Sequence, residues 1–257
     1  MNMSVNFPNS KSKHLNPEQT AEFGRRVDEI RRDVMESLGE QDAKYIYKIR
    51  NFVRYSEIAS RGMLMFGGWI PPVWVVGTGL LGISKIVENM ELGHNVMHGQ
   101  FDWLNDPSLN GANYDWDTMS TGDDWKYTHN YIHHTYTNVV GKDHDVGYGL
   151  LRVSESQKWE PRFLFNIPLA IQLMVFFEWY VGVQNLHLED ALIYKTKTWK
   201  QVWADATKFR KKARRQILKD YVFFPVIAGP NALPVFAGNA IANVIRSLWS
   251  SAVIFNG

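Results

Sequence analysis

Two short histidine clusters are the part of the sequence best suited to chemistry. His94 and His98 are four positions apart, as are His129 and His133, and His134 follows directly. Four residues slightly exceed one turn of an α-helix, so each pair projects two imidazoles from one helix face. The imidazole of His134 then points about 100° away around the helix. Two helices of this kind can supply a nitrogen-rich cage for one or two transition-metal ions.

The surrounding residues exclude several kinds of metal site. A zinc protease needs a glutamate after the first histidine as general base, but Asn95 and Asn130 stand at that position. A ferritin-like di-iron bundle needs two E-x-x-H motifs, and the chain has one, formed by Glu91 and His94. The absence of cysteine excludes the usual iron–sulfur clusters and thiolate-ligated haem. Haem held by two histidines stays open, although it would leave the other clustered histidines without a role.

The sequence around both clusters resembles a known family. The segments G-H-N-V-M-H-G-Q and H-N-Y-I-H-H-T-Y-T-N are similar to the first and second histidine boxes of the membrane fatty acid desaturases. Their flanks resemble the bacterial acyl-CoA desaturases of that family, and the similarity covers residues 45–257. The resemblance implies two non-haem iron ions that use O₂ to introduce a double bond into an acyl chain. The iron ligands that it implies are His94, His98, His129, His133 and His134.

Five further residues are candidates for supporting roles. His144 lies between two aspartates and His187 follows a predicted helix, so both are candidate additional ligands. Asn95, Asn130 and Asn138 lie in or near the boxes, where a polar side chain can orient an imidazole through its free N–H. We predict no catalytic side chain beyond the metal ligands.

The family also has a third box, H-x-x-H-H, after its last membrane helices. This chain ends at Gly257 in an apolar segment and contains no such motif. We therefore interpret it as a truncated form with part of the family's ligand set. Two alternatives stay open: a related membrane fatty-acyl hydroxylase, and a catalytically inert membrane metal-binding remnant.

Composition and patterning predict an all-α, integral membrane protein. Ten tryptophans suit a lipid–water boundary, while the mean hydropathy of −0.27 requires a large polar part. The N-terminus has no apolar stretch typical of a secretory signal. We expect membrane-embedded helical hairpins with a cytoplasmic helical cap that carries the histidine boxes, and hence an active site on the cytoplasmic side.

Two regions are predicted, a cytoplasmic amphipathic one over residues 1–62 and a membrane desaturase domain over 63–257, incomplete at its C-terminus. Asn16 and Gln19 form a helix start in the first region. In the second, residues 63–87 carry a single charge and are long enough to cross a hydrocarbon core of about 30 Å. Because the pair Pro71-Pro72 favours a turn, we expect a hairpin there.

The rest of the chain is predicted to return to the same side. Residues 101–124 form a loop whose tryptophans, together with Trp125, are expected at the bilayer surface, and Thr121 caps the second histidine helix. Residues 163–185 are expected to lie in the interface or to enter and leave it, because a full crossing would put the cationic run 208–219 opposite the histidines. A second hairpin is expected over 221–257.

The predicted reaction determines which partners the protein needs. They are a long-chain acyl-CoA or other acyl substrate, O₂, membrane lipid and a separate electron donor. The sequence contains no H-P-G-G and no cysteine motif, so electrons are expected to come from outside. The resemblance implies a ferredoxin, a cytochrome or a flavoprotein reductase. The cationic run either anchors the chain at anionic lipid or binds coenzyme A phosphates or an acidic donor. The net charge of +2 gives no indication of a nucleic-acid partner.

Overall fold

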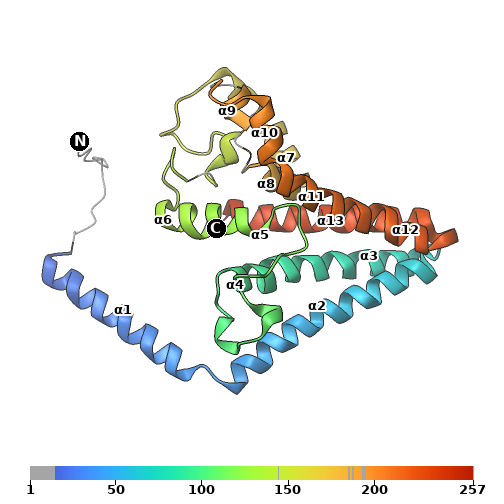
Figure 1. The fold of residues 1–257 in the computed structure, drawn as a ribbon, viewed down its shortest axis with the longest axis horizontal. Helices are drawn as coiled ribbons and strands as arrows, with labels where there is room; N and C mark the ends of the chain where they lie inside the picture. Colours follow the sequence, from blue (N-terminus) through green and yellow to red (C-terminus); the bar gives the residue numbers. More distant parts are fainter. Residues whose placement is uncertain (1–14, 144, 185, 187, 193–194, 257) are drawn as a thin grey trace. The chain divides into compact units, whose positions relative to one another are not determined.

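The computed structural model describes residues 15–143, 145–184, 186, 188–192 and 195–256, which form helices and loops without a strand (Figure 1). This confirms the all-α prediction for the described residues. The longer helices are α1 (Pro17–Ser37), α2 (Glu40–Gly67), α3 (Pro71–Ile86), α7 (Asn166–Val175), α8 (Phe177–Gln184), α10 (Trp199–Asp205), α11 (Thr207–Ile217) and α13 (Ala232–Asn256). The shorter ones are α4 (His94–Met97), α5 (Gly122–Trp125), α6 (His134–Tyr136), α9 (Leu188–Leu192) and α12 (Phe224–Ile227), with π-helical turns η1 (Val87–Gly93), η4 (Lys126–His133) and η7 (Leu218–Phe223).

The chain forms two compact units, Met1–Tyr45 and Ile46–Gly257. In the first, the predicted capping box begins α1: the Asn16 side chain accepts the backbone N–H of Gln19 at 2.8 Å, and the Gln19 side chain accepts that of Asn16 at 3.0 Å. The apolar side chains along α1 are exposed within this unit. The functional division at residues 62 and 63 stays a prediction.

Two helical hairpins form the centre of the second unit. The first joins α2 to α3, and the second joins α12 to α13; in Figure 1 their turns lie at the same end. The indole N–H of Trp69 donates to the carbonyl oxygen of Pro230 at 2.9 Å, and that of Trp74 donates to Pro234 at 2.8 Å. The first turn differs from the prediction, because the prolines at 71 and 72 occupy the first positions of α3, where a missing N–H costs nothing.

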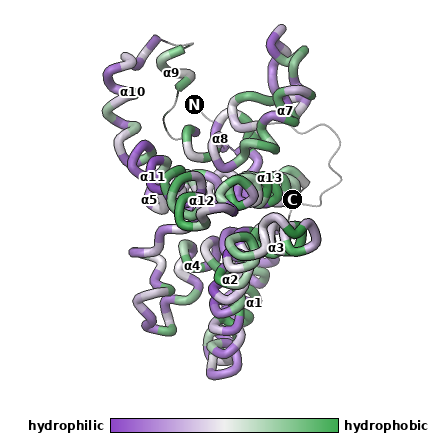
Figure 2. Tube along the Cα trace, turned by 90° about the vertical axis from the view of Figure 1, so that its right-hand side faces the viewer, coloured by the Kyte–Doolittle hydropathy of each residue, from purple (hydrophilic) through white to green (hydrophobic). Residues whose placement is uncertain are grey.

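The helix α13 packs along α3 through small residues. A Cβ atom added to Gly82 would lie 3.0 Å from Cγ2 of Ile245, so the glycine permits this approach. Leu64, Leu81 and Val235 form the buried apolar core between the hairpins, and Figure 2 shows the hydrophobic residues along α12 and α13.

By length and composition, no single helix among the described residues could span a membrane. The stretches Pro161–Val175 and Phe177–Gln184 pass that test as a pair, with a bend of 96° between them. This bend falls inside the segment that was expected to lie in the interface or to enter and leave it.

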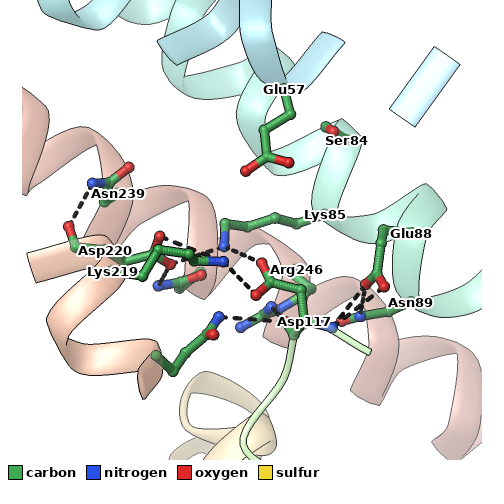
Figure 3. A network of polar contacts seen from close by, with 12 residues as sticks. Glu57, Ser84, Lys85, Glu88, Asn89, Asp117, Lys219, Asp220, Asn239 and Arg246 are labelled. Atoms are coloured by element: carbon green, nitrogen blue, oxygen red, sulfur yellow. Dashed lines mark hydrogen bonds and ion pairs between the residues drawn. The ribbon is translucent and has the colours of Figure 1, made fainter. Parts of the chain in front are cut away.

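A buried network of charges joins the hairpins to the loop before the second histidine box (Figure 3). Asp220 is fully buried and accepts from Lys85 at 2.9 Å and from Arg61 at 3.1 Å. Lys85 also donates to Asp117 at 3.2 Å, and Lys219 donates to the same carboxylate. Burying charges is costly unless each is paired, as these are. The network therefore fixes the loop that leads to the second histidine helix.

Candidate metal centre

The first histidine pair follows directly from the hairpin. After α3 the helix widens into η1 and continues as α4, so His94 and His98 lie at the end of the return helix. Their Nε2 atoms face one another at 2.8 Å. The polar end of an otherwise apolar helix therefore presents two imidazole nitrogens to one point.

The second cluster lies on a helix that begins at Thr121, as predicted: its hydroxyl oxygen accepts the backbone N–H of Asp124 at 3.3 Å. The following residues form the π-helical η4 rather than a regular α-helix. The rings of His129 and His133 stack with 4.9 Å between centroids and 14° between planes, while His134 stands nearly perpendicular to His129. π-Helical turns are rare in proteins as a whole, and those that occur are often found at functional sites.

The two clusters converge. Ring centroids of His94 and His129 are 5.2 Å apart, as are those of His98 and His129, and His98 and His134 are 4.9 Å apart. One nitrogen from each of His94, His98 and His129 lies within 4.8 Å of the others. His129 and His133 form a second group of this size with Asp145. The structure thus brings the five predicted ligands together; their role as ligands stays a prediction.

The clusters are held by contacts behind the rings. The Asn130 side chain donates to the carbonyl oxygen of Met97 at 2.9 Å, directly joining the two histidine segments. Trp125 stacks on His129 with 4.3 Å between centroids and also contacts Trp116. The expectation that these tryptophans rest at the bilayer surface was wrong, because both are buried in a cluster with Met97, and Trp125 also contacts the histidine rings. Trp103 is half-buried against a neighbouring apolar core.

Burial keeps the imidazoles of His94 and His98 neutral. Loss of solvent, and then the neighbouring imidazoles, lower the pKa of His94 to about 3 and that of His98 to about 4. The same causes lower the pKa of His134. Neutral imidazoles are the form that binds metal. A set of neutral, converging nitrogens therefore fits transition-metal ions such as iron.

Two carboxylates complete the cluster on the side of His133. The imidazole Nδ1 of His133 lies 2.9 Å from Asp143 and 3.5 Å from Asp145. Asp145 also lies 3.6 Å from Nδ1 of His129. Sequence reasoning noted these aspartates only as the neighbours of His144. The D-H-D pattern was the available signal, but it does not say which imidazole the carboxylates reach.

The remaining candidates are the asparagines predicted to orient imidazoles and the two possible additional histidine ligands. The side chain of Asn95 donates to the backbone carbonyl of Glu91 at 2.7 Å. Asn138 contributes its backbone N–H, which donates to Asp143 at 2.8 Å. The role of the asparagines in orienting imidazoles stays a prediction. His144 and His187 lie outside the described residues.

A cavity of about 310 Å³ lies beside the histidines. His94, His129 and His133 form part of its wall, and Arg246 and Glu178, which are paired and buried, form another part. Polar side chains such as Thr118, Gln184 and Ser247 also line it, together with apolar and aromatic ones: Trp116, Trp125, Tyr148, Phe177, Val181 and Ile254. The arrangement can hold a largely apolar molecule against the imidazoles.

Comparisons with known proteins bear on this site. The NADPH-dependent stearoyl-CoA 9-desaturase of Mycobacterium tuberculosis is 43% identical over 251 residues, which are 95% of this chain and 58% of that protein. An sn-1 linoleoyl-lipid 6-desaturase of Synechocystis is 30% identical over 129 residues, or 49% of this chain and 35% of that protein. That of Arthrospira platensis is 24% identical over 197 residues, or 74% and 52%.

The chain thus spans little more than half the length of the mycobacterial desaturase that it matches. No solved structure matches it significantly. Residues 68–257, which include both histidine clusters and the cavity, match the fatty acid desaturases as a family. The predicted resemblance is confirmed: the chain belongs to the fatty acid desaturase family.

Proposed function

We propose that the chain provides the first two histidine boxes and the acyl cavity of a membrane di-iron desaturase. The observation that carries this is the convergence of imidazoles from two separate helical segments on one side of a cavity of about 310 Å³. The proposed activity is the introduction of a double bond into a fatty acyl chain, with O₂ and external electrons.

The proposed iron ligands are His94, His98, His129, His133 and His134. Their nitrogens converge, burial lowers the pKa of His94 and of His98 so that these two are neutral, and imidazole suits iron. Iron bound there would supply the O₂-dependent oxidation that an unactivated methylene C–H bond requires. The protein's own contribution is to keep the imidazoles in place and to exclude water behind them with Trp116 and Trp125.

The substrate proposed is a long-chain acyl-CoA. Phe177, Val181 and Ile254 line the cavity and can hold a hydrocarbon chain in a fixed position beside the histidines. Exposed cations on α11, such as Lys211, Arg214 and Arg215, can face coenzyme A phosphates or an acidic electron donor. The helix α11 is tied to the site, because its buried Lys212 pairs with Asp115 in the loop before the second box.

The proposed location is an integral membrane protein with its active site on the cytoplasmic side. The apolar parts of the two hairpins would lie in lipid, with exposed side chains such as Phe66, Val76 and Leu233 facing the acyl chains. His94 and His98 follow the lipid-facing part of α3, so they would lie just outside the hydrocarbon. Electrons would come from a separate ferredoxin, cytochrome or flavoprotein reductase.

The test is an assay of membranes that contain the chain, with stearoyl-CoA, O₂ and a reducing system. Mass spectrometry of the acyl products should show an alkene, and purified protein should contain iron. His98→Ala should abolish the product, whereas His14→Ala, which removes a histidine outside both boxes, should retain it. An alcohol as the product would favour the hydroxylase. Bound metal without any oxidised product would favour the inert metal-binding remnant.

A further inference from the structure

Asp143 is a buried carboxylate with an unusual set of partners. Its side chain is 1% exposed, although carboxylates are rarely buried without a pairing cation. Among the described residues no lysine or arginine forms an ion pair with it; its side-chain partner is the imidazole of His133, whose Nδ1 lies 2.9 Å from Oδ2. The group therefore needs a role that offsets the cost of removing it from water.

The hydrogen bonds of Asp143 decide which atom of His133 carries the proton. One carboxylate oxygen, Oδ2, accepts the backbone N–H of Asn138 at 2.8 Å, and the other, Oδ1, accepts that of Asp145 at 3.0 Å. Because these contacts use the carboxylate as an acceptor, the short contact at Nδ1 of His133 requires that Nδ1 donates. In the neutral imidazole that a metal requires, the second ring nitrogen, Nε2, is then left without a proton and with a lone pair.

From this geometry we infer that Asp143 is a positioning residue of the metal centre: it binds Nδ1–H of His133 and thereby presents Nε2 as the metal-binding atom. This rests on the proposed function. Carboxylates that accept from the distal nitrogen of a ligand histidine fix its orientation and increase its basicity. The same contact ties the turn at residues 138–143 to the second histidine helix.

Asp145 is the competing candidate. Its Oδ2 lies 3.5 Å from Nδ1 of His133 and 3.6 Å from Nδ1 of His129, so it could itself be a ligand beside the two imidazoles. Asp143 makes the shorter contact with His133 and is buried, so it is the favoured partner of that imidazole. The Nδ1 atom that donates to Asp143 cannot also bind a metal. Substituting Asp143 and substituting Asp145 should therefore affect metal binding differently, and the two effects can be measured separately.

The first measurement is cobalt binding by the purified chain, since Co²⁺ reports its ligands by visible absorption. Asp143→Ala should weaken Co²⁺ affinity by about 10- to 100-fold, the range typical of such partners. The Co²⁺ affinity of Asp143→Asn should lie between those of Asp143→Ala and the wild type, because the amide oxygen still accepts from Nδ1 but the charge is lost. Asp205→Asn, at an exposed aspartate paired with Lys197, should bind as wild type does. Wild-type affinity in both Asp143 variants would overturn the inference, as would a loss confined to Asp145→Asn.

The second measurement needs no metal. Nitrogen NMR of ¹⁵N-histidine-labelled protein, with the His133 signals assigned by their loss in His133→Gln, should show His133 protonated at Nδ1. In Asp143→Ala it should populate the Nε2–H form, a change that a purely structural role of Asp143 would not produce. An Nε2–H tautomer in the wild type would overturn the inference. If the wild-type chain instead binds no metal but shows the expected tautomer, the proposed function fails while the Asp143–His133 contact stands.

Discussion

The side-chain amide of Asn130 donates to the carbonyl oxygen of Met97 at 2.9 Å, and this one bond joins the two histidine segments. Met97 immediately precedes His98, and Asn130 immediately follows His129. A shift of either segment would therefore move an imidazole in the cluster. The relationship makes Asn130 a structural link between boxes that are far apart in the sequence.

Asn130→Ala should lower metal content and stability together. It leaves the carbonyl of Met97 without its partner, at a cost of about 1–3 kcal/mol. Thermal unfolding and iron analysis of the purified variant check this. Asn113→Ala provides the control, because Asn113 is exposed and bonds only within its own loop. Unchanged iron content and stability in Asn130→Ala would show that the link is not needed.

Asp220→Ala should be strongly destabilising. Asp220 is fully buried and pairs with both Lys85 and Arg61, so its removal leaves two buried cations without this partner. Breaking a buried pair in this way costs about 3–5 kcal/mol. Denaturant unfolding in detergent measures the loss, with the exposed Asp205→Asn as the comparison. A change below about 1 kcal/mol would contradict the part assigned to the network.

Two glycines on α3 should respond in opposite ways to alanine. At Gly82 a Cβ would lie 3.0 Å from Ile245 of α13, so Gly82→Ala should separate the hairpins and cost about 1–3 kcal/mol. At Gly79 a Cβ meets nothing within 4 Å, so Gly79→Ala should be neutral or stabilise by up to about 1 kcal/mol. Thermal unfolding of the two variants side by side tests the packing. Equal effects would mean that α3 and α13 do not approach as described.

Much of this arrangement could be predicted from local signals. The capping residues Asn16 and Thr121 begin helices as expected, and the spacing within each histidine box placed its imidazoles on one helix. Motif spacing alone could not give the π-helical form of η4, because the wider turn depends on tertiary contacts rather than on residue types.

The errors concern residues whose chemistry suits two environments. An indole is equally suited to a lipid boundary and to a core, so only the fold could show that Trp116 and Trp125 lie behind the histidines. The contact of Asp143 with His133 depends on the turn between them, where Asn138 adopts a left-handed conformation with φ of 61°. No spacing rule predicts such a contact.

Glu88 should make stability depend on pH. Burial and the neighbouring carboxylate of Asp117 raise the pKa of Glu88 from 4.5 to about 7, while hydrogen bonds from the Asp117 backbone N–H and the Tyr114 hydroxyl partly oppose this. A raised folded-state pKa means that the contribution of the neutral acid is complete below pH 4.5 and is lost as pH rises through about 7.

Glu88→Gln removes this titration while retaining an oxygen that can accept. Its stability relative to wild type should therefore rise between pH 4.5 and about 7 and then level off. Because the side chain is half-buried, we expect a total gain on the order of 2 kcal/mol. Unfolding in detergent at a series of pH values measures the difference, and Glu36→Gln, on the exposed surface of α1, is the control that should show no such rise. A difference that stays constant with pH would mean that Glu88 is ionised at little cost in the folded protein.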